Sequence, residues 1–455
     1  ESFHLVVHGL GGPVGFDLIR RIPQRIQSLT VLNTLVNVSR FNKPLTMRPF
    51  TVPGLGYLWT LQMNSPILYP TSKFKLISHG IHSCRPKQEV PMTDQKKVYT
   101  KVVKTLKRDL KMFHQGYVVT LAMMITGIVL GKKAQLSAMS AEIPHKAKDR
   151  SIEKRMCRFV QHEKVDVELT YMPFAEQILR SLAAEPLLLA MDGSQVGRGC
   201  MVLMVGVIYR SRLLPIAWVV YKGKKGHTTA ERHIEVLEKV LPLLPEKNEV
   251  ILLGDAEYDT TEMLLWVETE TSWFFAMHTS PSILVKSGLT WEKINELTLR
   301  KGRLRMIRDI EFTQTSALPA NLVLWWGEEY EEPIYLVTNL PSGSHTCWYY
   351  RRRFRIETFF SDQKSRGFHI HKSHLSNPHR ISRLLIAACL AYIWMIALGL
   401  LTLANGNHKL IDRTDRIDKS LFRLGIDWLR YALKKQKRFN VYFRFQPDKL
   451  TLHVG

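Results

Sequence analysis

Two aspartates follow apolar runs that indicate buried strands, and their carboxylates are candidates for joint chemistry. Asp192 follows EPLLLAM and Asp255 follows EVILLG. Ligand and catalytic groups gather at strand ends in open α/β sheets, so we expect Asp192 and Asp255 on adjacent strands with their carboxylates facing each other. The alternative is that each is a turn or helix-capping residue, which is the commoner role of a lone aspartate after a strand.

A third acid stands among cations and aromatic residues in YYRRRFRIETFFSDQK, residues 349–364. On a continuous helix, Tyr350, Arg353, Glu357 and Lys364 fall on one face within an arc of roughly 60°. A buried glutamate facing two aspartates is destabilised by like charge unless divalent ions lie between them. Three carboxylates with two such ions suit two-metal phosphoryl transfer. Without those partners, the stretch is a solvated basic helix face.

The composition favours a globular protein with a polyanionic partner. Lys and Arg number 64 against 40 Asp and Glu, a formal charge of +24 spread over most of the 455 residues. Such a chain is long enough for two or three domains with their own cores. The five cysteines form no CxxC pair, which argues against a disulfide framework or a zinc site and favours a reducing cytosol.

One apolar run raises the question of a membrane. Residues 384–404, LLIAACLAYIWMIALGLLTLA, carry no charge and are long enough to span a bilayer. The alternative is a core helix that is buried on all sides. We favour the core helix because basic sequence flanks the run at both ends, and we expect no membrane partner and a cytoplasmic location.

Residues 1–83 differ from the rest of the chain. The stretch HLVVHGLGGPVGFDLIRRIPQRIQSLTVLNT predicts a strand, a glycine turn, a helix and a second strand. It resembles the nucleophile-elbow region of α/β-hydrolases, especially dehalogenase-like ones, but the nucleophile position falls on Gly9. Glycine has no side chain for attack. We therefore interpret this segment as a truncated, non-catalytic piece fused to the front of the chain. Because residue 1 is Glu, we expect either that the true start is missing or that the sequence is a fragment.

Residues 84–170 are predicted to be helical and basic. Apolar residues recur at helical spacing after Met92, and cations recur along the opposite face at steps of four, three, four and three. These cations are Lys97, Lys101, Lys104, Arg108 and Lys111. The row is either a solvated surface or a face that follows DNA phosphates.

The remaining chain alternates strands and helices. Three strands, a helix, a strand, a helix and a strand are predicted in 171–285, followed by an antiparallel insert in 286–342. The helix of residues 349–364 and the apolar helix occupy 343–405, and a basic tail occupies 406–455. The fold class is therefore α/β with a mixed sheet.

The spacing Tyr350-x2-Arg353-x3-Glu357-x6-Lys364 resembles the Y-x2-R-x3-E-x6-K signature of DDE transposases from bacterial insertion sequences, in the insertion-sequence-four-like group. Asp192 in MDGS and Asp255 in GDAEYD stand where that family has its two aspartates. The resemblance implies a ribonuclease-H-like (retroviral-integrase-like) catalytic core with a small all-β insert, preceded by a helical DNA-binding region.

The resemblance also implies roles for these residues. Asp192, Asp255 and Glu357 would bind two Mg²⁺ or Mn²⁺ ions, and Tyr350, Arg353 and Lys364 would grip phosphates beside the cleaved end. The implied reaction is DNA cleavage and strand transfer at insertion-sequence ends, through a hairpin intermediate. The implied partners are double-stranded DNA, as transposon ends and target, and a second copy of the chain in a homodimer.

Two other functions remain open from the sequence. A ribonuclease-H-like endonuclease would need the same three acids but not the Tyr, Arg and Lys positions. A catalytically silent remnant of a transposase would bind DNA through residues 92–165 without cutting it, and the foreign front segment favours this reading. The intact set of candidate catalytic residues argues against it.

Overall fold

The computed structural model describes residues 3–9, 26–34, 93–226 and 228–445. The chain divides into two compact units, Glu1–Gln88 and Glu89–Gly455. In the first unit, strands β1 (Phe3–Gly9) and β2 (Ile26–Thr34) pair in parallel. This pairing agrees with the predicted strand–helix–strand unit, but the helix between the two strands lies outside the described residues.

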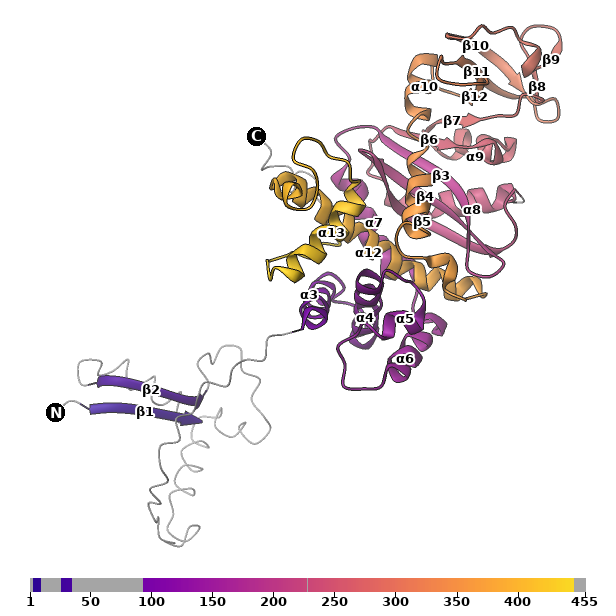
Figure 1. Ribbon diagram of the computed structural model, residues 1–455. Helices are drawn as coiled ribbons and strands as arrows, with labels where there is room; N and C mark the ends of the chain where they lie inside the picture. The colour runs from indigo at the N-terminus through magenta and orange to yellow at the C-terminus, as the bar shows by residue number, and fades with distance from the viewer. Residues whose placement is uncertain (1–2, 10–25, 35–92, 227, 446–455) are drawn as a thin grey trace, which may run out of the picture. The chain divides into compact units, whose positions relative to one another are not determined.

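The second unit begins with helices (Figure 1). They are α3 (Asp94–Asp109), α4 (Gln115–Gly131), α5 (Leu136–Ser140), α6 (Asp149–Gln161) and α7 (Val167–Ser181). The side chain of Thr93 caps α3 by accepting a hydrogen bond from the Lys96 N–H. Val98, Val102 and Leu106 form the buried stripe of α3, so its apolar spacing produced the expected amphipathic helix.

A ten-stranded mixed sheet forms the centre of the second unit, in the order β5-β4-β3-β6-β7-β12-β11-β10-β8-β9. Strands β3, β4 and β5 pair antiparallel, and β3, β6 and β7 pair in parallel. The bounds are β3 (Leu187–Val196), β4 (Cys200–Tyr209), β5 (Arg212–Lys222), β6 (Val250–Gly254), β7 (Phe274–His278), β8 (Leu284–Lys286), β9 (Trp291–Lys293), β10 (Arg303–Phe312), β11 (Leu318–Trp326) and β12 (Ile334–Thr338).

The antiparallel strands predicted in residues 286–342 extend this sheet. Strand β12 pairs antiparallel with β7, through Leu336 opposite His278 and Thr338 opposite Ala276. Strands β12, β11 and β10 then continue the antiparallel pairing outward. The strands of the insert are therefore hydrogen-bonded to the sheet that carries the candidate acids.

Helices cover the sheet and join it to the first helices. In Figure 1, α8 and α9 lie to one side of strands β3 to β6 and the segment of α10 and α11 lies to the other. Their bounds, with those of the last two helices, are α8 (Ala230–Val240), α9 (Thr261–Glu270), α10 (Gly343–Tyr350), α11 (Arg355–Gln363), α12 (Pro378–Ala404) and α13 (Leu421–Lys434).

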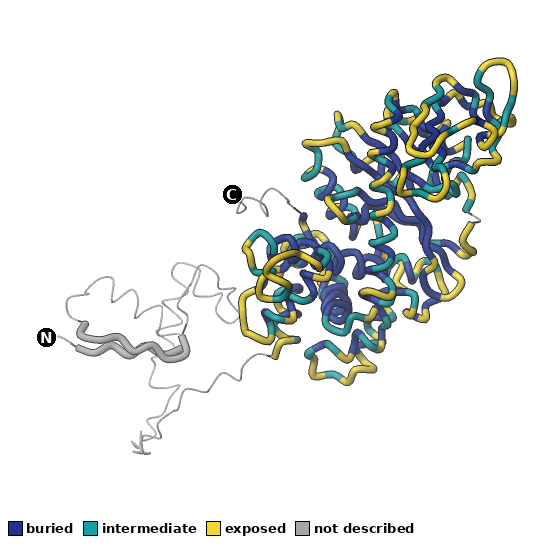
Figure 2. Tube along the Cα trace, turned by 45° about the horizontal axis from the view of Figure 1, so that its top comes forward, coloured by how far each residue is buried: buried dark blue, intermediate teal, exposed yellow. Residues whose placement is uncertain are grey.

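Helix α12 contains the long apolar run, and it is a core helix. By length and composition it is the one described helix that could cross a membrane, but 94% of its most apolar window is buried inside the protein. Figure 2 shows this burial as dark blue along the sheet strands and the central helix. The core interpretation of residues 384–404 is therefore confirmed, because the protein itself supplies the apolar surroundings that the helix needs.

Helix α13 crosses α12 at unusually close range. A Cβ atom on Gly425 would lie 2.0 Å from the Met395 carbonyl oxygen, and one on Gly399 would lie 2.0 Å from the Leu421 carbonyl oxygen. The two glycines therefore let the backbones of the two helices touch. Because the obstacles are main-chain atoms, no side-chain rotation can make room.

Gly425→Ala should lower the free energy of unfolding by roughly 1–3 kcal/mol, because the added methyl group forces α12 and α13 apart. The matched control is Gly131→Ala at the end of α4, where the nearest atom would be Cγ of the flexible Glu142 side chain. The control should be neutral or stabilising by up to about 1 kcal/mol, since alanine favours helix. Urea denaturation measures both, and equal stabilisation by the two substitutions would contradict the close crossing.

Candidate active site

The register of the sheet places the two aspartates at equivalent positions on neighbouring strands. The parallel pairing of β3 with β6 runs to Ala190 opposite Leu253, two residues before Asp192 and Asp255. Strand β3 continues to Val196 through its pairing with β4, so the prediction that its strand ends at Asp192 is wrong. The parallel pairing with β6 ends just before Asp192, whereas β3 itself continues beyond this residue. Asp192 therefore lies next to the point where β6 ends, at Gly254.

The carboxylate of Asp192 lies in a buried position. The residue is 8% exposed, and its Oδ1 accepts a 2.7 Å hydrogen bond from the Gly193 N–H. The hydroxyl of the buried Tyr258 lies 3.5 Å from the same oxygen. Burial raises the pKa of Asp192 to about 6, although the positive charge of Arg353 opposes this. The positive charges near Asp192 therefore do not fully offset the cost of burying its charged form.

Asp255 has the opposite electrostatic environment. Its Oδ1 lies 3.3 Å from His278 Nδ1, and its Oδ2 lies 3.8 Å from Arg353 Nη1. The contact with His278, and then the charge of Arg353, hold the pKa of Asp255 well below its usual range, against the effect of burial. Asp255 also caps a short 3₁₀ turn by accepting from the Ala256 N–H, so the capping role that the sequence left open is one of its roles.

Arg353 connects the third acid to the two aspartates. Its Nη2 lies 3.1 Å from Glu357 Oε1, and its guanidinium lies 5.6 Å from the centroid of the Tyr350 ring. The side chain is 11% exposed, and within the described part of the chain Nη1 has no hydrogen-bond partner. The charge of Arg353 also acts on Asp192. One guanidinium therefore serves as the counter-ion for all three carboxylates.

The single helical face predicted for residues 350–364 is wrong. Helix α10 ends at Tyr350, and α11 begins at Arg355. Between them the N–H groups of Arg352 and Arg353 bond three residues back, to Tyr349 and Tyr350, which is the tighter 3₁₀ pattern. The break still leaves Tyr350, Arg353 and Glu357 together, because the contacts described above cross it.

Lys364 lies apart from that group and reaches the first aspartate strand. It follows the last residue of α11, and its Nζ donates a 2.6 Å hydrogen bond to Ser194 Oγ on β3. Burial, and then the nearby charge of Lys225, lower the pKa of Lys364, while Asp192 acts in the opposite direction. The lysine is therefore held beside Asp192 and not beside Arg353.

The three acids provide hard oxygen donors of the kind that Mg²⁺ and Mn²⁺ prefer. In the ranges that the structure describes, no group of three or more His, Cys, Asp or Glu side chains is gathered closely enough to hold a metal ion. The guanidinium of Arg353 lies against Asp255 and Glu357 instead. The three carboxylates are therefore suitable ligands for divalent ions, and two of them, Asp255 and Glu357, already pair with the guanidinium of Arg353.

Sequence reasoning missed two residues at this site. His278 is the last residue of β7, the strand after β6, and its ring stacks on Tyr350 with centroids 6.3 Å apart. The rule that pointed to strand ends at Asp192 and Asp255 applies equally to His278 and could have found it. Tyr258, which contacts Asp192, gave no signal of its own in the sequence.

The five cations predicted in a row on one face differ in their surroundings, and their role in DNA binding stays a prediction. Lys97 and Arg108 pair with the acids Asp94 and Asp109, so these two charges are neutralised. Lys101 Nζ donates to the Phe439 carbonyl oxygen at 2.7 Å and lies over the ring of that residue, so it packs inward. Lys104 and Lys111 are exposed, but Lys111 lies beyond the end of α3.

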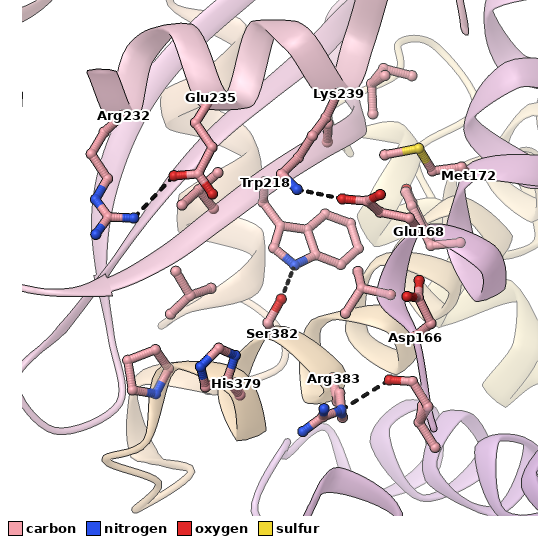
Figure 3. A pocket seen from close by; sticks show the side chains of 18 of the residues that line it. Asp166, Glu168, Met172, Trp218, Arg232, Glu235, Lys239, His379, Ser382 and Arg383 are labelled. Atoms are coloured by element: carbon pink, nitrogen blue, oxygen red, sulfur yellow. Dashed lines mark hydrogen bonds and ion pairs between the residues drawn. The ribbon is translucent and has the colours of Figure 1, made fainter. Parts of the chain in front are cut away.

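A separate cavity of about 380 Å³ lies among α7, β5, α8 and the start of α12 (Figure 3). Four of its charged groups form two ion pairs, Arg232 with Glu235 and Lys239 with Glu168. The Trp218 indole N–H donates to Ser382 Oγ at 2.9 Å. None of the residues predicted to be catalytic lines this cavity, so we do not assign the chemistry to it.

Comparisons with known proteins point to one family. Residues 185–394, slightly less than half of the chain, match the family model described as "Transposase DDE domain", and this range contains Asp192, Asp255 and Glu357. No curated protein matches the chain.

Two solved structures show weak likeness. The cryo-EM structure of the piggyBac transposase synaptic complex with hairpin DNA has 10% identity and a TM-score of 0.38, over 79% of this chain and 83% of that chain. The crystal structure of Aa-Ago with externally bound siRNA has 11% identity and a TM-score of 0.22, over 52% of this chain and 35% of that chain. Both scores are too low to carry an argument about fold.

Replacing each aspartate by asparagine should change stability in opposite directions. Because the folded state disfavours the charged form of Asp192, Asp192→Asn should raise the free energy of unfolding at pH 8 by roughly 2–3 kcal/mol. The gain should shrink as the pH falls through about 6 and disappear below about 4, where the native carboxyl group is protonated in both states.

Asp255→Asn is the matched comparison. Because the pKa of Asp255 is lowered on folding, this substitution should lower the free energy of unfolding at neutral pH, and the loss should fade as the pH falls below about 4. Urea denaturation in EDTA across this pH range measures both variants. A change of the same sign in the two variants at pH 8 would show that the electrostatic description of the site is incorrect.

Proposed function

We propose that the protein is an enzyme of the DDE transposase type, which cuts DNA at insertion-sequence ends and transfers the cut strand to target DNA. The match of residues 185–394 to the transposase DDE domain supports this proposal. The observation that carries the proposal is that Arg353 pairs with Asp255 and Glu357 inside that domain and that its charge also acts on Asp192. Three acids from separate elements that share one cation suit phosphoryl transfer better than a structural role.

The order of strands supports a ribonuclease-H-like core within this domain. Three antiparallel strands, β3 to β5, are followed by α8, β6, α9 and β7, with β6 and β7 parallel to β3. We propose that β3 to β7 with α11 form this core and that β8 to β12 are an insert attached to its edge. The helices before residue 170 would then be a DNA-binding region, although Lys101 is directed inward.

Divalent ions, Mg²⁺ or Mn²⁺, would be held by Asp192, Asp255 and Glu357. When bound there, two ions would lower the pKa of the attacking water and neutralise the charge that develops on the phosphate. In the absence of ions, Arg353 stabilises the carboxylates and keeps them from repelling each other. When DNA and metal bind, the carboxylates would exchange the guanidinium of Arg353 for divalent ions.

The other residues of the site have roles in binding and orienting DNA. Arg353 carries a planar fork of N–H donors that suits phosphate oxygens as well as carboxylates. Lys364 is held on Ser194 beside Asp192, where it would contact a phosphate next to the scissile bond. His278 contacts Asp255 and stacks on Tyr350, so it orients both residues.

The finer features of the reaction rest on the signature residues. Tyr350, Arg353, Glu357 and Lys364 stand at the spacing of the insertion-sequence-four-like group, and from this we propose cut-and-paste transposition through a hairpin intermediate. Tyr350 is buried and its ring stacks on His278, so it would contribute by positioning Arg353 beside the DNA. The active assembly would be a homodimer that holds two transposon ends.

Glu357→Gln should abolish metal-dependent nicking of DNA and leave DNA binding unchanged. The amide keeps the size of the side chain but removes a charged ligand from the carboxylate group. The measurement is conversion of supercoiled plasmid carrying the element's terminal inverted repeats to the nicked form with Mn²⁺, together with a gel-shift assay on the same DNA.

Glu329→Gln is the control, because Glu329 is an exposed acid that pairs with Arg351 away from the carboxylate group. This variant should nick as well as the unsubstituted protein. Equal nicking by Glu357→Gln and Glu329→Gln would remove Glu357 from the catalytic site. Binding without nicking by the unsubstituted protein would instead identify it as a silent, DNA-binding transposase.

A further inference from the structure

A basic cavity of about 360 Å³ lies beside the segment that follows α11. Its lining consists of Lys133, Gln135, His369, Lys372 and His374. Within the part of the chain that the structure describes, none of the residues lining this cavity is acidic. None of the five was identified from the sequence, and none belongs to the carboxylate group around Arg353.

The segment that forms one wall of the cavity is tied down at both ends. The Phe368 carbonyl oxygen accepts a 2.7 Å hydrogen bond from the Ala134 N–H, in the link between α4 and α5. The Leu375 carbonyl oxygen accepts a 2.7 Å bond from the Arg198 N–H, in the turn between β3 and β4. The cavity is therefore a fixed feature of the fold and not a gap between loose surface side chains.

Two residues of this segment adopt a backbone conformation that costs energy. His369 and His374 have φ angles of 51° and 60°, in the left-handed region that residues with a side chain rarely adopt. The His369 N–H donates a 2.9 Å bond to the Lys364 carbonyl oxygen, which helps to hold this turn. The unusual backbone brings both imidazole rings to the lining of one cavity.

The cations around the cavity repel one another. Burial, followed by the charges of Lys372 and Lys133, lowers the pKa of His369. Burial, then the nearby His369, Lys372 and Lys364, lowers the pKa of His371. Arg198, which does not line the cavity, has its Nη2 3.2 Å from Nδ1 of the lining residue His374. Such a concentration of positive charge and N–H donors is suited to an anion with several acceptor oxygens.

The cavity is connected to the catalytic residues through Lys364. That lysine donates to Ser194 beside Asp192, and its carbonyl oxygen holds the His369 turn. Its charge also reaches His371. A polyanion that touches the carboxylate group and continues past Lys364 would therefore come next to Lys372 and Lys133.

We propose that this cavity binds backbone phosphates of the DNA duplex next to the cleaved end, with Lys133 and Lys372 as the charged contacts and the histidines as N–H donors. The proposal rests on the proposed function, because it takes DNA as the substrate of the adjacent site. It adds a phosphate contact from outside residues 185–394, because Lys133 lies in the link between α4 and α5.

The test compares two double variants of the full chain. Lys133→Gln/Lys372→Gln removes both charges from the cavity, and Lys247→Gln/Lys293→Gln removes two charges from exposed positions elsewhere. Binding of a fluorescent duplex of arbitrary sequence is measured by anisotropy at several KCl concentrations without divalent metal. Because each lost phosphate contact lowers the salt slope by about 0.9, the cavity variant should lose roughly 1–2 units of slope.

The cavity variant should also bind DNA roughly tenfold or more weakly at about 0.1 M salt, whereas the control keeps the slope of the unsubstituted protein. Lys133→Arg/Lys372→Arg should restore the slope, which separates lost charge from damaged folding. Equal slopes for the cavity variant and the control overturn the proposal. Calorimetric binding of inorganic phosphate combined with equal DNA slopes would overturn it as well, by assigning the cavity to a free anion.

Failure of this proposal and failure of the proposed function can be distinguished. Equal slopes in a protein that nicks DNA with Mn²⁺ would remove the cavity from DNA binding and leave the transposase reaction in place. A reduced slope in a protein that does not nick would support the cavity as a phosphate site and count against the catalytic proposal.

Discussion

Repulsion among three carboxylates is the constraint around which this site is built. Asp192 is buried, Asp255 and Glu357 come from other elements and pair with Arg353, and the positive charge of Arg353 also acts on Asp192. Without a cation, such a cluster would expel one acid or protonate it, and the raised pKa of Asp192 shows that even Arg353 does not compensate fully. The arrangement suits a site whose full charge balance comes from its ligands.

The sheet determines which acids meet. The parallel pairing of β3 with β6 ends just before Asp192 and Asp255, so the two backbones separate where the carboxylates need space. The neighbouring strand β7 adds His278 at the same edge, and β12 continues the sheet into the insert. The core helix α12 contacts β5 of this sheet and is nearly all buried, which gives the sheet a rigid support.

Patterns that depend on local sequence were predictable, and contacts between distant segments were not. The apolar runs before Asp192 and Asp255 predicted adjacent strands because burial on both faces requires continuous apolar sequence. The break between Tyr350 and Arg355 was not predictable from helical periodicity, since a few 3₁₀ turns change the backbone without changing the spacing of the residues. Likewise, nothing in the sequence around Lys101 indicates its contact with Phe439, more than 300 residues away.

The position of Arg353 also explains how the same residue can serve two ligands in succession. A guanidinium binds carboxylate and phosphate with the same planar geometry, so under the proposed function DNA phosphates would compete directly with Asp255 and Glu357 for Arg353. In the proposed reaction, an arginine that turned toward DNA would leave the acids without their counter-ion, and their affinity for divalent cations would rise. Under the proposed function, substrate binding and metal binding would be coupled through one side chain, and the cost of separating Arg353 from Asp255 and Glu357 would restrain the site until both ligands were present.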